Sequence, residues 1–167
     1  LTLHATCSFG LSWILFPHGF GYDPHVHRAA ESYLWQFGSL EPKTPYYIGQ
    51  YVLVLTLHAI TGASIATIDN LMTPLIALTI PAVAYYGLQK SYHLTKQESL
   101  VGTLAIFLIP HLPLTFSVPH NLTVVVLLCI VLLGPGANTR AEKSLLLLLG
   151  FFALTLHPLL GVPCLIL

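Results

Sequence analysis

The sequence predicts an all-α fold: a polytopic bundle of transmembrane helices with one amphipathic juxtamembrane helix. Hydrophobic residues make up 55% of the 167 residues and charged residues only 7%. A soluble domain carries about 25% charged residues, so this chain cannot build a water-facing surface. The apolar residues also gather into runs that approach the roughly 20 residues needed to cross a bilayer. The zero net charge argues against nucleic acid as a partner.

The apolar runs define the expected spans. They cover about residues 1–16, 46–66, 71–89, 99–116, 119–134 and 144–167. Because the chain begins and stops inside apolar runs, we expect residues 1–167 to be a single membrane domain and a piece of a longer protein. Ile68-Asp69-Asn70 interrupts the apolar pattern and is interpreted as a loop. Residues 46–66 therefore have two alternatives: a full crossing or, as we favour, a re-entrant or surface helix packed against protein.

An amphipathic helix is expected over about residues 24–37, after the first span. Asp23 is a favoured N-cap, and Pro24 suits the first helical position. Gly38 can end the helix as its C-cap. The apolar face comprises Val26, Ala30, Tyr33, Leu34 and Phe37, and the opposite face Arg28, Ser32 and Gln36. This division predicts a helix that lies on the membrane surface.

Basic residues predict the orientation in the membrane. Lys90 and Lys96 mark one polar loop, and Arg140 and Lys143 mark another. Both loops are expected on the cytoplasmic side, which places the loop at residues 110–121 outside. The loop at residues 17–45 is net acidic. It lies outside only if one helix between residues 46 and 88 does not cross the membrane. Most of the histidines would then share the outer side, either around a functional cavity or because imidazole tolerates interfaces.

Two groups of short motifs carry a resemblance. The first is Gly21-Tyr22-Asp23-Pro24 with the amphipathic helix and Pro45-Tyr46-Tyr47; the second is Leu100 to Ile109, Pro110, Ser117 and Pro119-His120-Asn121-Leu122. Over most of residues 10–135 this layout resembles the GT-C class of polytopic glycosyltransferases, which includes oligosaccharyltransferases, protein mannosyltransferases and aminoarabinose transferases. In that class a first span precedes an outer loop with an essential Asp and juxtamembrane helices. The resemblance implies sugar transfer from a polyprenyl-phosphate donor to an acceptor on the outer face.

Asp23 is the candidate catalytic residue. The resemblance makes it the base that takes the acceptor proton, while the local sequence equally fits an N-cap. Arg28 and Lys43 are candidates to bind the donor phosphate, although snorkelling to headgroups explains them as well. Tyr47 and Gln50 are candidates to line a sugar or lipid groove, and for Tyr47 an aromatic belt is the alternative.

A divalent metal, Mg²⁺ or Mn²⁺, is a candidate cofactor. His27 and Glu31 follow Asp23 at successive i+4 spacings and share its helix flank. Together with His120 they are the candidate ligands, and a solvated helix flank is the alternative for His27 and Glu31. The chain departs from the GT-C pattern at His120-Asn121, where the second acidic residue is expected. Either His120 replaces it as a ligand, or the enzyme works without metal, or activity has been lost.

We therefore expect an integral membrane protein, in the plasma membrane of a prokaryote, whose partners are membrane lipid and a polyprenyl-phosphate sugar. The first hypothesis is a GT-C-like hexosyl- or oligosaccharyl-transferase. The alternative is a non-catalytic polytopic membrane protein, a transporter or assembly subunit, which the missing second carboxylate supports. A histidine-rich metal-binding membrane protein is a third hypothesis, and the lack of a tight His/Cys/Glu motif counts against it.

Overall fold

The described part of the chain is mostly helical and contains no strand. The computed structural model describes residues 2–16, 22–40, 46–106, 114 and 116–166. Its elements are α1 (Thr2–Leu15), α2 (Asp23–Phe37), α3 (Ile48–Thr61), α4 (Ile65–Ala77), α5 (Ile80–Lys90), α6 (Lys96–Ile106), α8 (Pro119–Leu133), the 3-10 turn η1 (Gly134–Gly136), α9 (Arg140–Leu156) and α10 (Pro158–Ile166). The predicted all-α class is confirmed.

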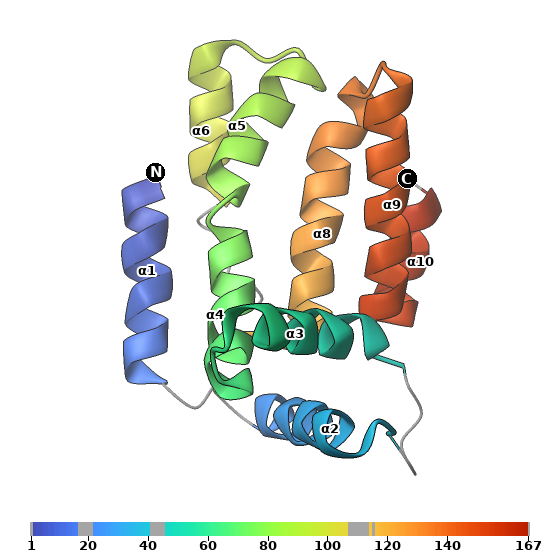
Figure 1. Cartoon of the computed structure of the whole chain (residues 1–167). Helices are drawn as coiled ribbons and strands as arrows, with labels where there is room; N and C mark the ends of the chain where they lie inside the picture. The colour runs from blue at the N-terminus through green and yellow to red at the C-terminus, as the bar shows by residue number, and fades with distance from the viewer. Residues whose placement is uncertain (1, 17–21, 41–45, 107–113, 115, 167) are drawn as a thin grey trace.

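The helices form an upright bundle that two transverse helices close at one end. In Figure 1, α1, α4–α5, α6, α8, α9 and α10 stand side by side, while α2 and α3 lie across the end at which α4 begins. Helix α3 lies within residues 46–66, and whether this range crosses the membrane stays a prediction. Its first turn packs directly on α9, because a Cβ on Gly49 would lie 2.3 Å from Thr155 Oγ1. The absence of a side chain at Gly49 therefore fixes where α3 meets the bundle.

Helix α2 has the predicted bounds. It ends at Gly38, which has a φ of +68° and donates its N–H to the carbonyl oxygen of Leu34 at 2.9 Å. A left-handed residue of this kind strongly favours glycine. The face that α2 turns toward the protein includes Glu31, which is fully buried, whereas Phe37 is exposed. The alternative of a solvated flank is therefore wrong for Glu31.

Helix α4 begins earlier than the apolar pattern indicated. Ser64 caps it by accepting the N–H of Thr67 at 3.1 Å. Asp69 and Asn70 consequently lie inside a helix, and their interpretation as a loop is wrong. Polar residues interrupt hydropathy without interrupting backbone hydrogen bonds, which explains the error. Within the described residues, two helical segments, Ile65–Lys90 and Pro119–Gly136, are long and apolar enough to cross a bilayer.

Residues 144–167, the expected last span with an interruption at His157-Pro158, are divided between α9 and α10. The break falls at His157, whose φ of −152° and ψ of 102° are extended, and Pro158 opens α10. The two helices pack side by side, since a Cβ on Gly161 would lie 2.3 Å from the Cα of Leu154. Helix α10 therefore runs back along α9 (Figure 1).

A shared apolar core joins the transverse and upright helices. Its buried members are Val54, Ile68, Met72, Leu122, Val126, Ile130, Ala153, Leu156 and Cys164. They come from α3, α4, α8, α9 and α10. Burial of this apolar surface therefore holds α3 over the end of the bundle.

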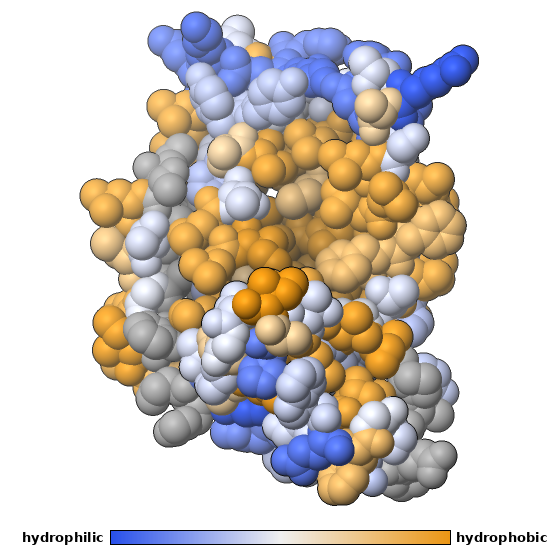
Figure 2. All heavy atoms as spheres, in the orientation of Figure 1, coloured by the Kyte–Doolittle hydropathy of each residue, from blue (hydrophilic) through white to orange (hydrophobic). Residues whose placement is uncertain are grey.

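The two ends of the bundle differ in chemistry. Figure 2 shows hydrophilic side chains gathered at the end opposite α2 and α3, above an apolar middle. Helix α5 ends there at Lys90 and α9 begins there at Arg140. The ion pair between Lys90 and Glu142 ties α5 to α9. All four residues that marked the expected cytoplasmic loops belong to this basic end.

Candidate functional site

Polar side chains from three helices meet beneath the transverse layer. Arg28 and Glu31 come from α2, Gln50 from the first turn of α3, and Asp69 and Asn70 from α4. Glu31, Gln50 and Asp69 are each 0% exposed. We call these five residues the polar cluster. Charged side chains are almost never fully buried unless they are paired, so the cluster is the candidate functional site.

Gln50 links the two carboxyl groups of the polar cluster. Its Nε2 atom donates to Glu31 Oε1 at 3.4 Å and to Asp69 Oδ1 at 3.3 Å. The guanidinium group of Arg28 donates through Nη2 to Asp69 Oδ2 at 3.3 Å and to Asn70 Oδ1 at 2.6 Å. Asp69 therefore contacts both the amide and the cation, whereas Glu31 contacts the amide alone.

The charges of the polar cluster do not cancel if both acids are ionised. Burial raises the pKa of Glu31 well above its usual value, and the neighbouring Asp69 carboxylate raises it further, while the Gln50 hydrogen bond and Arg28 oppose the shift. Glu31 therefore carries a proton at neutral pH. With Glu31 neutral, one carboxylate faces one guanidinium, and the buried site is neutral overall.

Three buried polar atoms of the cluster have no hydrogen-bond partner within the described residues. They are Arg28 Nε, Glu31 Oε2 and Gln50 Oε1. A buried polar group without a partner costs free energy. One donor and two oxygens are thus available to a ligand, to water or to a substrate.

A row of rings extends from the polar cluster across the same end of the bundle. His27 Nδ1 lies 2.8 Å from the hydroxyl of Tyr51, and the His27 ring meets the Tyr47 ring edge-on at 5.2 Å. The Tyr47 and His157 ring centroids lie 5.5 Å apart, and those of His157 and His120 lie 5.6 Å apart. The row therefore joins α2 to the start of α8.

The structure divides the residues predicted from the sequence into three groups. Arg28, Glu31 and Gln50 belong to the polar cluster, and His27, Tyr47 and His120 form the ring row. Asp23 is exposed at the first position of α2. Its predicted N-cap role is wrong, because Tyr22 holds the N-cap position and α2 has no side-chain cap hydrogen bond. Lys43 lies outside the described residues.

The predicted metal ligands do not form one group. Within the described residues, no three His, Cys, Asp or Glu side chains are placed to hold a metal ion together. His27 faces Tyr51, whereas Glu31 faces Gln50. Glu31 and Asp69 offer the oxygen ligands that Mg²⁺ favours, but the Asp69 carboxylate already forms an ion pair with Arg28. The donor set fits a divalent ion poorly, so the metal stays a prediction and no step below depends on it.

Asp69 is the residue that the sequence reasoning missed. It was interpreted as a loop residue, although it stands in an otherwise apolar segment. An ionisable residue at such a position is functional by default, so its position was already a signal. Its partner Arg28 lies 41 positions away, so only the fold reveals that the Asp69 carboxyl group lies in the same cluster as Glu31.

Comparisons with known proteins identify no relative: no family model, no curated protein and no solved structure matches the chain.

Proposed function

We propose that this chain belongs to a polytopic integral membrane protein of the GT-C type, in the plasma membrane of a prokaryote. It transfers a sugar from a polyprenyl-phosphate donor to an acceptor on the outer face. The observation that carries the proposal is the polar cluster, in which two buried carboxyl groups and one guanidinium group meet at one end of an apolar helical bundle. Intramembrane or interfacial charges of this kind are costly and are retained for function.

The arrangement of the helices supports the outward placement of the site. The basic end carries Lys90, Lys96, Arg140 and Lys143, and cytoplasmic loops are enriched in Lys and Arg. The polar cluster lies at the opposite end. Helices α2 and α3 both lie across the bundle, which supports a chain that stays on one side of the membrane between α1 and α4. The GT-C resemblance implies the same layout: a first span, then juxtamembrane helices, then a helix that returns into the membrane.

The residues of the polar cluster suit the chemistry of sugar transfer. Asp69 takes the proton of the acceptor hydroxyl. The acceptor oxygen bonds to the anomeric carbon while the bond from that carbon to the phosphate oxygen breaks. The phosphate leaves with the electron pair. Arg28, whose Nε has no partner in the described chain, stabilises this departing charge, and protonated Glu31 donates a hydrogen bond.

Sugar transfer by the purified full-length protein in liposomes tests the proposal. Polyprenyl-phosphate hexoses with a radiolabelled sugar are supplied, and release of the sugar to acceptor or water is measured. Asp69→Asn is expected to reduce turnover at least about a hundredfold, the low side of the usual contribution of a proton-transfer group. Glu31→Gln, which changes a hydrogen-bonding group, should reduce turnover by a smaller factor. Glu142→Gln alters an exposed carboxylate at the basic end and should leave turnover unchanged.

Asp23→Asn decides between two bases within the same experiment. Asp23 is the base that the resemblance implies, whereas Asp69 is the base that the contacts with Gln50 and Arg28 favour. Loss of turnover in Asp23→Asn alone would return that role to Asp23. Two outcomes would overturn the proposal. One is full turnover in all three variants, Asp69→Asn, Glu31→Gln and Asp23→Asn. The other is no turnover by the wild-type protein with any polyprenyl-phosphate hexose.

A non-catalytic transporter or assembly subunit is the second candidate. It is favoured by the complete burial of Glu31 and Asp69, because a catalytic base must reach its substrate. A buried carboxyl group with a raised pKa is also suited to carry a proton. Proton uptake into the same liposomes that depends on Glu31, without sugar release, would support this function.

A further inference from the structure

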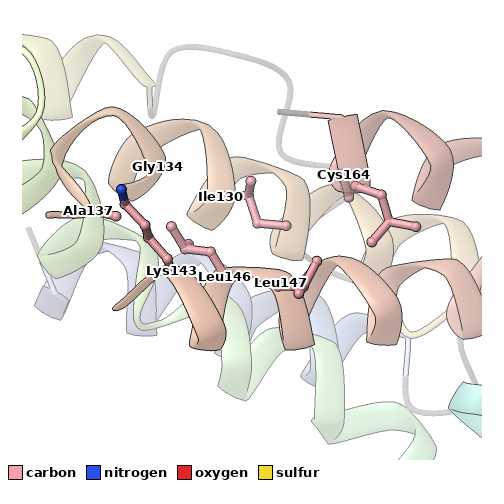
Figure 3. Close-up of a pocket in the computed structure, with 8 residues that line it drawn as sticks. Ile130, Gly134, Ala137, Lys143, Leu146, Leu147 and Cys164 are labelled. Carbon is pink, nitrogen blue, oxygen red and sulfur yellow. The ribbon is translucent and has the colours of Figure 1, made fainter. Parts of the chain in front are cut away.

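A cavity at the basic end of the bundle has no part in the proposed function. It has a volume of about 310 Å³ and lies between α8, α9 and α10. Ile130, Leu146, Leu147 and Cys164 line its apolar part, and Gly134 and Lys143 lie at its polar end. Figure 3 shows the Lys143 side chain reaching toward Gly134, with Leu147 and Cys164 farther along the helices.

We propose that this cavity binds one acyl chain of an anionic glycerophospholipid, whose phosphate is held by Lys143. The volume equals roughly ten water molecules at about 30 Å³ each, which is room for a segment of a chain and not for a whole lipid. The outer faces of α9 and α10 are apolar and exposed, with Leu148 66% and Leu159 80% exposed. Leu147 both lines the cavity and is 52% exposed on α9, so the cavity borders this apolar surface.

The charge of the cavity specifies an anion. Lys143 makes no ion pair with any residue in the described part of the chain, whereas Lys90 in the adjoining cavity is paired with Glu142. Lys143 and Arg140 also lie in the first turn of α9, where the helix dipole disfavours cations. A phosphate group at Lys143 offsets both effects. Basic pockets between helices on the cytoplasmic side are typical sites for such headgroups.

Headgroup charge, and not the acyl chain, sets the selectivity of this site. An acyl chain that leaves the bilayer for the cavity exchanges one apolar environment for another, so its transfer contributes little. One cation near the membrane surface strengthens anionic-lipid binding about fivefold. We therefore expect phosphatidylglycerol to be preferred about fivefold over phosphatidylcholine.

Photo-crosslinking of the full-length protein in lipid nanodiscs tests this proposal independently of sugar transfer. Phosphatidylglycerol and phosphatidylcholine, each with a diazirine in one acyl chain, are compared, and the labelled peptides are identified by mass spectrometry. Label from phosphatidylglycerol is expected on the peptides that contain Leu147 and Cys164. Lys143→Gln should remove the fivefold preference. Lys96→Gln, an exposed cation at the same end, is the matched control and should keep it.

Two further arms of the experiment separate occupation of the cavity from attraction to the surface charge. Leu147→Trp fills the cavity without changing the charge and should reduce the label on the Cys164 peptide, while far-UV circular dichroism checks that the fold is retained. Unlabelled phosphatidylglycerol should compete for the site better than polyprenyl phosphate at equal concentration. Three outcomes would each overturn the proposal. They are equal labelling by the two lipids, an equal effect of Lys143→Gln and Lys96→Gln, and stronger competition by polyprenyl phosphate than by phosphatidylglycerol.

Discussion

The ion pair between Arg28 and Asp69 is expected to be the most sensitive point of the fold. Asp69→Ala leaves the guanidinium group without its carboxylate and removes one acceptor from Gln50. Removing one partner of a buried ion pair costs about 3–5 kcal/mol. The Arg28 side chain is 16% exposed and keeps its 2.6 Å hydrogen bond to Asn70. We therefore expect the free energy of unfolding to fall by about 2–3 kcal/mol, at or just below the low end of that range.

A double-mutant cycle separates loss of the pair from loss of packing. Replacing both charges by apolar groups is often close to neutral, so Arg28→Met combined with Asp69→Ala should recover at least about 1 kcal/mol relative to the sum of the single changes. Unfolding by SDS in mixed micelles, followed by far-UV circular dichroism, measures each free energy. Asp23→Ala is the control, since an exposed carboxylate should cost no more than about 0.5 kcal/mol. Additive single changes, or an Asp69→Ala variant as stable as this control, would refute the reasoning.

Three further changes test the packing and the charges. Gly49→Val places a side chain against Thr155 and should displace α3 from α9, lowering the free energy of unfolding by about 1–3 kcal/mol; a variant as stable as wild type in the same SDS titration contradicts this contact. Because the raised pKa makes folded Glu31 bind its proton more tightly, stability falls as pH rises above the usual value of 4.5, and a Glu31→Gln variant with the same pH profile as wild type would disprove the shift. Glu142 shows the opposite behaviour: its hydrogen bonds with Lys90, and then with the backbone at its helix start, lower its pKa to about 2. Its stabilising effect is therefore complete above pH 4.5 and lost toward pH 2, and thermal unfolding of Glu142→Gln should lack this acid sensitivity.

The bounds of α2 and the all-α class were readable from the sequence because their causes are local. Pro24 suits the first turn of α2, and Gly38 ends the helix through its left-handed backbone conformation. The scarcity of charged residues indicates an apolar protein. The start of α4 was also encoded locally, by the side-chain cap from Ser64. The polar residues Asp69 and Asn70 hide this start in the hydropathy pattern, because they interrupt the apolar run inside the helix.

The composition of the site was decided by tertiary structure. Periodicity shows that Asp23, His27 and Glu31 share one flank of α2, but it does not say what that flank meets. Glu31 is buried because Gln50 and Asp69 lie opposite it, whereas Asp23 stays exposed beyond the contact between the helices. A buried polar group is tolerated only where hydrogen-bond partners compensate its lost hydration. Those partners lie 19 to 41 positions away in the chain, so the sequence determined the helices and only their packing determined which acids form the site.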